Sequence, residues 1–106
     1  MAIEYVTIAP ASDEHPRNDS ATAVQLRDGS IFLVWMEFFA SEWVSKDEAP
    51  NRLSSLRSTD GGRTWGAHQV EATTEPGDRS VYNPSLLRLA NGEILFVAPL
   101  VGWTLC

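Results

Sequence analysis

The sequence predicts an all-β fold, and three observations lead to that prediction. Short apolar or alternating segments recur along the 106 residues, and most of them end at residues that favour turns. No segment carries a clean apolar stripe with the period of a helix. A strand–turn–strand pattern early in the chain also returns near its end.

The N-terminal part is expected to hold a strand, a loop and a hairpin. Residues 3–8 alternate and are rich in β-branched side chains, which favours a strand. Residues 9–20 are polar and contain two prolines, so they are expected to form a loop. Residues 21–27 form a short predicted strand, and Asp28-Gly29 after it accepts the positive φ angles of a tight hairpin turn.

The next strand is predicted to be the most buried one. Residues 31–38 are almost continuously apolar, which indicates burial on both faces of a sheet. A long polar loop over 40–51 precedes a third predicted strand at 53–57. A fourth is predicted at 68–72, and residues 73–80 form a linker.

The strand–turn–strand pattern of residues 21–38 then recurs. Residues 81–89 precede Asn91-Gly92, and an apolar strand is predicted over 93–100. A shift of 63 residues aligns Leu26 with Leu89, Gly29 with Gly92, Ile31 with Ile94 and Val34 with Val97. Such self-similarity is typical of a β-propeller or another repeated β-meander. The alternative is two unrelated hairpins that use the same turn chemistry.

Composition narrows the function classes. The chain carries 14 acidic and 8 basic residues, a net charge of −6, which disfavours nucleic acid and anionic membranes as partners. One cysteine, Cys106, excludes an internal disulfide framework and a multi-cysteine zinc site. No phosphate-binding glycine loop is present, and His15 and His68 lie far apart without ligand spacing, so no cofactor or metal is expected. Residues 1–10 lack the basic region of a secretory signal, and the compartment stays open.

The strongest motif is Ser-Thr-Asp-Gly-Gly-Arg-Thr-Trp at residues 58–65. Asp60 can accept hydrogen bonds from backbone N–H groups of the turn, glycine at position 62 permits φ > 0, and Trp65 can pack against the turn. The segment resembles the Asp box of sialidases and related propellers, Ser-x-Asp-x-Gly-x-Thr-Trp. We interpret it as a rigid structural clip rather than a catalytic or calcium site, because in that family these boxes lie away from the active site.

Two further segments resemble the same family. Residues 81–87 (VYNPSLL) are similar to the Asp-Pro-Ser-Leu-Leu segment that opens the second blade, with Asn83 in place of the acidic residue. Residues 17–21 (RNDSA) are similar to the arginine-containing entry of the first blade, where the family has Arg-Ile-Pro. With Gly29 as the anchor, Arg17 falls two residues early.

The resemblance implies a six-bladed β-propeller of which about two blades are present. Blade 1 would span about residues 17–72 and the start of blade 2 about 81–100, with residues 1–10 as a strand that closes the ring. A blade takes about 40–50 residues, so six need well over twice this length. We therefore expect a fragment, a truncated reading frame, or a two-blade unit that assembles, for example as a homotrimer.

The resemblance also implies a site for an acidic sugar. Arg17 is the best candidate for holding a carboxylate, because a guanidinium matches it bidentately, and Arg79 is a weaker one. Asp47, in the loop before the third strand, is the acid/base candidate, and Glu37 is a third catalytic candidate. For each of them a solvated or packing role is the alternative.

Two functions from different classes follow. The first is a sialidase-like hydrolase of terminal sialic acid or a similar acidic sugar. Its nucleophilic tyrosine would come from later blades, so this chain alone should be inactive. The second is a non-catalytic Asp-box propeller that binds a glycan or a protein, which the missing Arg-Ile-Pro pattern favours.

Overall fold

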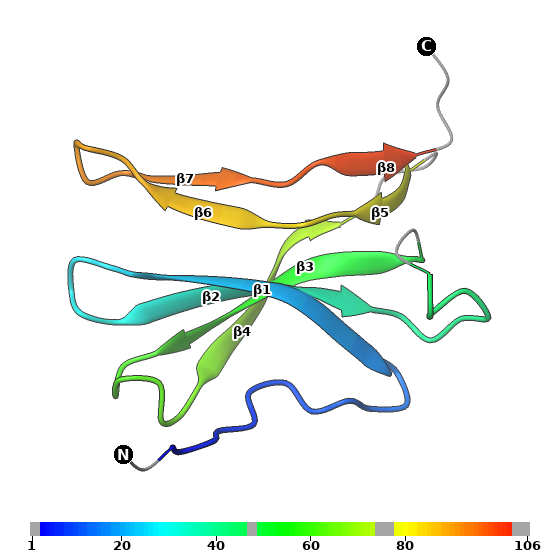
Figure 1. Cartoon of the computed structure of the whole chain (residues 1–106), viewed down its shortest axis with the longest axis horizontal. Coiled ribbons are helices and arrows are strands. Elements are labelled where there is room, and N and C mark those ends of the chain that lie inside the picture. Colours follow the sequence, from blue (N-terminus) through cyan, green and yellow to red (C-terminus); the bar gives the residue numbers. More distant parts are fainter. Residues whose placement is uncertain (1–2, 47–48, 74–77, 103–106) are drawn as a thin grey trace.

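A computed structural model describes residues 3–46, 49–73 and 78–102, which form two layers of antiparallel strands (Figure 1). The strands are β1 (Arg17–Gln25), β2 (Ile31–Phe38), β3 (Asn51–Ser58), β4 (Gly66–Thr73), β5 (Asp78–Val81), β6 (Ser85–Arg88), β7 (Ile94–Val97) and β8 (Leu100–Gly102). These residues contain no helix, which confirms the all-β prediction. No helix that could cross a membrane occurs in the described part of the chain.

The first layer is a four-stranded meander in the order β1-β2-β3-β4. Strand β2 lies in its interior, and it is buried on both faces from Val34 to Phe38, as its continuous apolar run predicts. Strand β3 pairs with β2 along its whole length, from Ile31 opposite Ser58 to Phe38 opposite Asn51. The first layer is therefore a four-stranded antiparallel meander, and the residues that the structure describes form no closed sheet.

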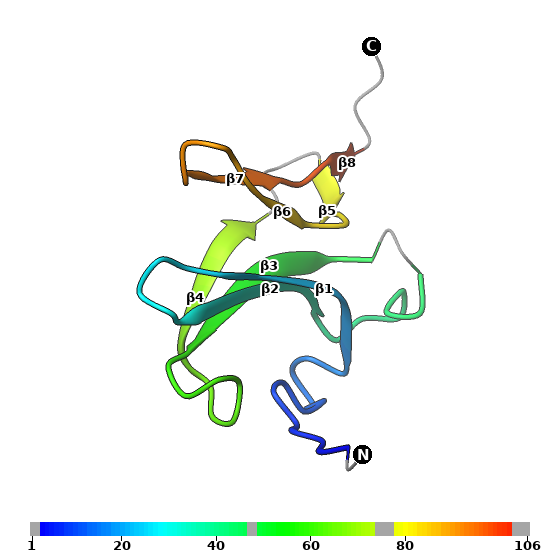
Figure 2. The same ribbon diagram turned by 60° about the vertical axis from the view of Figure 1, so that its left-hand side comes forward.

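The second layer is a long hairpin interrupted in the middle. Its β6–β7 part continues into the β5–β8 part, and the amide of Tyr82 bonds to the carbonyl of Pro99 at 2.9 Å between them. Figures 1 and 2 show this layer lying against the first sheet from two directions. The second layer is thus two strands wide, with β5 and β6 on one side and β7 and β8 on the other, whereas the first sheet is four strands wide.

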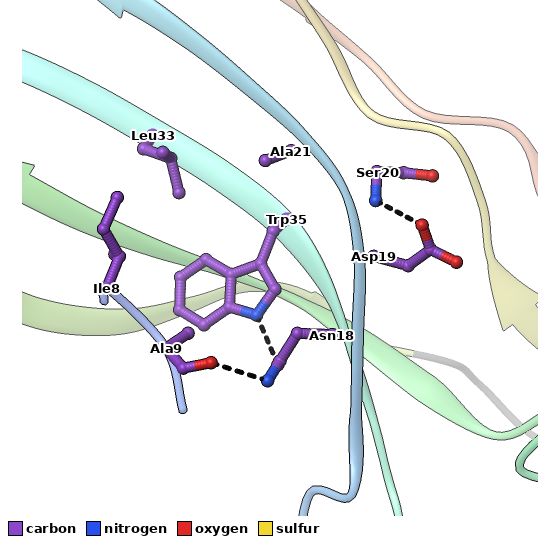
Figure 3. A pocket seen from close by; sticks show the side chains of 8 residues that line it. All are labelled: Ile8, Ala9, Asn18, Asp19, Ser20, Ala21, Leu33 and Trp35. Atoms are coloured by element: carbon purple, nitrogen blue, oxygen red, sulfur yellow. Dashed lines mark hydrogen bonds between the residues drawn. The ribbon is translucent and has the colours of Figure 1, made fainter. Parts of the chain in front are cut away.

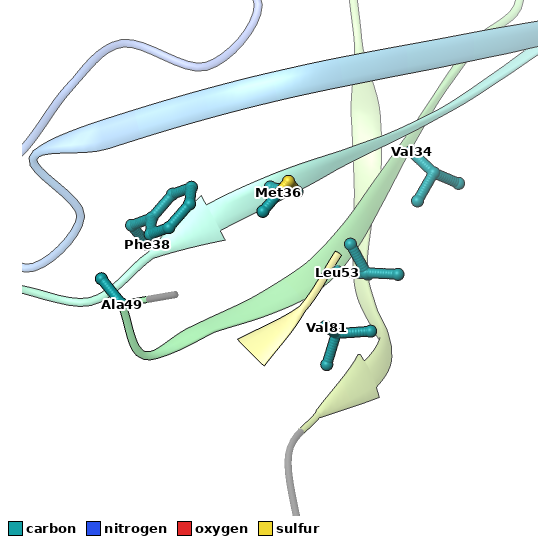
Figure 4. Close-up of a cluster of buried hydrophobic side chains, with 6 residues drawn as sticks. All are labelled: Val34, Met36, Phe38, Ala49, Leu53 and Val81. Atoms are coloured by element: carbon teal, nitrogen blue, oxygen red, sulfur yellow. The ribbon is translucent and has the colours of Figure 1, made fainter. Parts of the chain in front are cut away.

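The core lies between the two layers (Figure 4). Its fully buried apolar members are Val34, Met36, Phe38, Ala49, Leu53 and Val81. Asn51, also fully buried, clamps the layers together: its Nδ2 donates to the carbonyl of Val81 at 2.6 Å, and its Oδ1 accepts from the Val81 amide at 2.9 Å. A buried amide that satisfies both backbone groups of one residue fixes how the second layer sits on the first.

The 63-residue repeat exists in the structure as well as in the sequence. All four pairs of β6 with β7 become pairs of β1 with β2 when each number is lowered by 63. The two turns share their geometry, with φ 88° at both Gly29 and Gly92. Even the irregular positions correspond, because Ser20 and Asn83 have positive φ angles of 51° and 40°. Two unrelated hairpins would not share register, turn and bulge position, so the repeat interpretation accounts for the pattern.

Several predictions of secondary structure need correction. Residues 17–20, predicted as part of a loop, belong to β1, and residues 93–100, predicted as one strand, are split between β7 and β8. Residues 3–8 form no strand, because they pair with neither β1 nor β4, the edge strands of the first sheet, and so gain no ladder hydrogen bonds; Ile3 and Tyr5 are strongly exposed. Residues 81–89, predicted as one strand, are split between β5 and β6. The break falls at Asn83, whose left-handed backbone cannot continue a strand, and at Pro84, which lacks the N–H that a ladder needs.

Candidate functional site

Arg17 begins β1 and fastens the β2–β3 loop to the end of the sheet. Its guanidinium lies 4.3 Å from the centre of the Phe38 ring, on the neighbouring strand. Nη1 donates to the carbonyls of Val44 at 3.0 Å and Lys46 at 3.1 Å, both in that loop. Nη2 donates to Oδ2 of Asp19 at 2.7 Å. Arg17 therefore joins the strand entry, the loop and a carboxylate at one end of the first sheet.

Two of the predicted site residues, Asp47 and Arg79, have side chains outside the described part of the structure. Asp47 lies outside the described residues, so its place near Arg17 stays a prediction. The loop residues just before it do fold over the Arg17 end, because Lys46 accepts a hydrogen bond from Arg17. Arg79 lies in β5, and its side chain is also outside the described part of the structure.

The Asp box lies at the opposite end of the first sheet. Its first residue, Ser58, ends β3 opposite Ile31, whereas β3 begins at Asn51 beside the Arg17 end. Seven residues of extended strand span roughly 23 Å. Consecutive connections of an antiparallel meander lie at opposite ends of the sheet, and this separation removes Asp60 from any site built around Arg17.

The box itself is a closed hydrogen-bonded turn. Oδ1 of Asp60 accepts from the amides of Arg63 at 3.0 Å and Thr64 at 2.9 Å, and from the Ser58 hydroxyl at 2.9 Å. The Thr64 hydroxyl donates to Oδ2 of the same carboxylate. The Nε1 of Trp65 donates to the carbonyl of Gly62 at 2.9 Å. These contacts occupy the carboxylate with the turn itself, which is the arrangement of a structural clip.

Glu37 lies near the Arg17 end of the sheet but on its other face. Residues paired across antiparallel strands share a face, and consecutive residues alternate. Arg17 pairs with Phe38, and Glu37 pairs with Asn18. The side chains of Arg17 and Glu37 therefore point to opposite sides, and the structure does not bring these two candidates together.

Glu37 is held in a polar cluster instead. Its Oε1 accepts from Nε of Arg52 at 2.7 Å and from the Ser54 hydroxyl at 2.9 Å, and Nε2 of His68 lies 3.5 Å away. Burial raises the pKa of Glu37, but the hydrogen bonds from Arg52 and Ser54 outweigh it and hold the pKa below its usual value. A general acid needs a raised pKa, so that it carries a proton near neutral pH. The environment of Glu37 instead favours the ionised carboxylate.

Both histidines gather around this cluster, although the sequence spacing suggested unrelated loop positions. Nε2 of His15 lies 3.3 Å from Nη2 of Arg52, and its Nδ1 lies 3.1 Å from the Phe38 carbonyl. The ring of His68 packs edge-on against Trp35, with ring centroids 5.8 Å apart. The pairing of β2, β3 and β4 brings His68 to Glu37 and Arg52, whereas His15 reaches Arg52 from the loop before β1; neither position follows from a local sequence pattern. The residues that the structure describes hold no group of acidic, histidine or cysteine side chains suited to a metal ion.

The same face of the first sheet carries a cavity of about 320 Å³ (Figure 3). Its lining consists of Ile8, Ala9, Asn18, Asp19, Ser20, Ala21, Leu33 and Trp35. The amide of Asn18 is engaged on both sides, because Nδ2 donates to the Ala9 carbonyl at 2.9 Å and Oδ1 accepts from the Trp35 ring at 2.8 Å. The lining is mainly apolar, and sequence reasoning missed this cavity because it lies between β1, β2 and the N-terminal segment.

Comparison with known proteins adds no relative, because no protein-family model matches the chain and no curated protein is significantly similar to it.

Proposed function

We propose that this chain is the N-terminal part of a sialidase-like Asp-box β-propeller and that its ligand is a terminal sialic acid or a similar acidic sugar. The observation that carries the proposal is the Arg17 end of the first sheet. There the entry of β1 meets the β2–β3 loop, while the Asp box lies at the far end. The repeated hairpin and the complete Asp-box motif support the fold on which the proposal depends.

In this proposal Arg17 binds the carboxylate of the sugar. Asp19 already places a carboxylate oxygen 2.7 Å from Nη2 of Arg17, and its side chain is 45% exposed, so a ligand carboxylate can displace it. Asp47 is assigned to protonate the glycosidic oxygen. The nucleophile belongs to later blades, so this chain binds the sugar without hydrolysing it.

A second candidate is a non-catalytic propeller module that binds a glycan. It is favoured by the state of Glu37, which is ion-paired, has a lowered pKa and faces away from Arg17. Under this alternative the Arg17 end binds sugar in the same way, and no residue of the chain takes part in bond cleavage.

An NMR titration of the ¹⁵N-labelled chain tests the proposal. N-acetylneuraminic acid at millimolar concentration should shift the amides of residues 17–19 and 41–46, and its methyl ester should shift them less, because the ester lacks the charge that Arg17 binds. Arg17→Met should abolish the shifts, whereas Arg57→Met, a change near the Asp-box end, should preserve them. Equal shifts with acid and ester, no shifts, or shifts centred on residues 58–65 would contradict the proposed site.

A further inference from the structure

The second layer presents an apolar face that nothing in the described chain covers. Leu87, Leu95 and Val97 lie on this face and are 56%, 44% and 50% exposed; we call it the outer hairpin face. They share a face because Leu87 pairs with Leu95, and Val97 lies two residues further along β7. Three neighbouring aliphatic side chains exposed to this degree indicate a surface that is covered in use.

The repeat identifies what covers the corresponding face of the first sheet. A shift of 63 residues relates the outer hairpin face to Val24, Phe32 and Val34. Val34 is fully buried in the core, and Phe32 packs against that core beneath the second layer. The outer hairpin face is therefore the second copy of a surface that the chain already covers once.

The inner side of the second layer, which covers the core, also has an equivalent in the first repeat. The equivalent residues line the cavity on the other side of the first sheet. Its six lining positions from Asn18 onward correspond, 63 residues later, to Val81, Tyr82, Asn83, Pro84, Phe96 and Ala98. Of these, Val81 belongs to the core and Tyr82, Phe96 and Ala98 pack against it. The cavity with Ala23 beside it, which we call the cavity face, is thus the unoccupied counterpart of a filled inter-layer contact (Figure 3).

We propose that a second copy of this chain docks its outer hairpin face on the cavity face, head to tail. Leu95 and Val97 of one copy would meet Leu33 and the exposed Ala23 of the next, so apolar surface covers apolar surface. Ser20 and Asn83, equivalent positions that already bond within the chain at 3.3 Å, would meet again between copies. This contact is independent of sugar binding.

A head-to-tail contact uses two different faces, so it either closes into a ring or extends into a filament. In the proposed propeller, later blades would occupy these same two faces, so the association between copies is a property of the 106-residue chain on its own. Either outcome distinguishes this contact from a two-fold dimer, in which one face meets its own copy.

Paired variants and light scattering test the proposal. At about 100 μM, a concentration at which exposed apolar surfaces associate, the wild-type chain should form a trimer or a larger assembly. Leu95→Asp places a charge on the outer hairpin face, and Ala23→Asp places one on the cavity face; both positions are exposed. Each variant alone should be monomeric. Their equimolar mixture should form a one-to-one dimer, because each supplies the face that the other lacks.

Trp43→Asp is the matched control, since it places the same charge on an exposed aromatic residue outside both faces and should associate like the wild type. Circular dichroism establishes that each variant is folded. A wild-type chain that stays monomeric overturns the proposal, and means that another segment or protein covers these faces. Dimers of Ala23→Asp alone, or a mixture that stays monomeric, also overturn it.

Discussion

At the residue scale, the clearest physical unit is the carboxylate of Asp60. Hydrogen bonds from the Thr64 hydroxyl and amide, and then from Ser58, lower its pKa from 3.8 to about 2. A lowered pKa in the folded state means that the ionised group stabilises the fold. The ionised carboxylate of Asp60 therefore stabilises the turn, which is a structural role.

The pH dependence of Asp60→Ala follows from this pKa. The substitution should lower the free energy of unfolding at pH 7, because the turn amides lose their acceptor. The stabilisation by Asp60 is present above the unfolded pKa of 3.8 and is lost as pH falls through about 2. Urea unfolding at several pH values should therefore show wild type and variant converging in stability as pH falls toward 2. A difference that is constant across this range would contradict the account.

The individual site residues were only partly predictable from sequence. The Asp box was recognisable because all its partners lie within eight consecutive residues, so local chemistry defines it. The surroundings of Glu37 were not, since Arg52 and His68 reach it through strand pairing and His15 through the path of the loop before β1. The position of the β2–β3 loop at the Arg17 end follows from the alternating directions of the strands, whereas the hydrogen bonds from Arg17 to Val44 and Lys46 depend on a loop path that no local pattern encodes.

At the element scale, the two hairpins show how one turn is specified twice. In each turn a backbone amide donates to a side-chain oxygen two residues earlier. The Ser30 amide donates to Oδ1 of Asp28 at 2.9 Å, and the Glu93 amide donates to Oδ1 of Asn91 at 3.0 Å. A glycine with φ 88° follows the acceptor both times. Turn chemistry of this kind is local, which is why both hairpins were predictable from sequence.

Gly29→Ala should lower the free energy of unfolding by about 1–2 kcal/mol, because an alanine Cβ is strained at positive φ. No atom lies within 4 Å of the added methyl group, so backbone strain is the sole cost. Gly66→Ala is the matched control: it also has open space, but its φ is not positive, so its stability should stay unchanged or rise slightly. Chemical denaturation measures both, and equal stabilities of the two variants would argue against the turn assignment.

The strand ends and the N-terminal segment were less predictable than the turns. Residues 3–8 have strong β-propensity, yet they pair with neither edge strand of the first sheet, because propensity alone does not bring a segment into register with a partner. The break between β5 and β6 depends on the left-handed backbone of Asn83, and the sequence marks this only weakly, by the proline that follows.

At the scale of the whole molecule, the chain is two copies of one hairpin, with the first extended to four strands and the second stacked on it. Strand β2 supplies three of the six fully buried apolar side chains of the core, and Asn51 fixes the second layer through the backbone of Val81. The stacking direction is what makes the outer hairpin face and the cavity face a matching pair.

Methyl NOEs measured by NMR on a chain labelled at isoleucine, leucine and valine test this stacking most directly. The account predicts contacts from the methyl groups of Val34 and Leu53 to those of Val81 and Leu86, which lie on the inner side of the second layer. Leu87 and Leu95 should show no contact with Val34, because they lie on the outer side. Contacts from Val34 to Leu87 or Leu95 in place of Leu86 would reverse the stacked face and contradict the repeat on which the account depends.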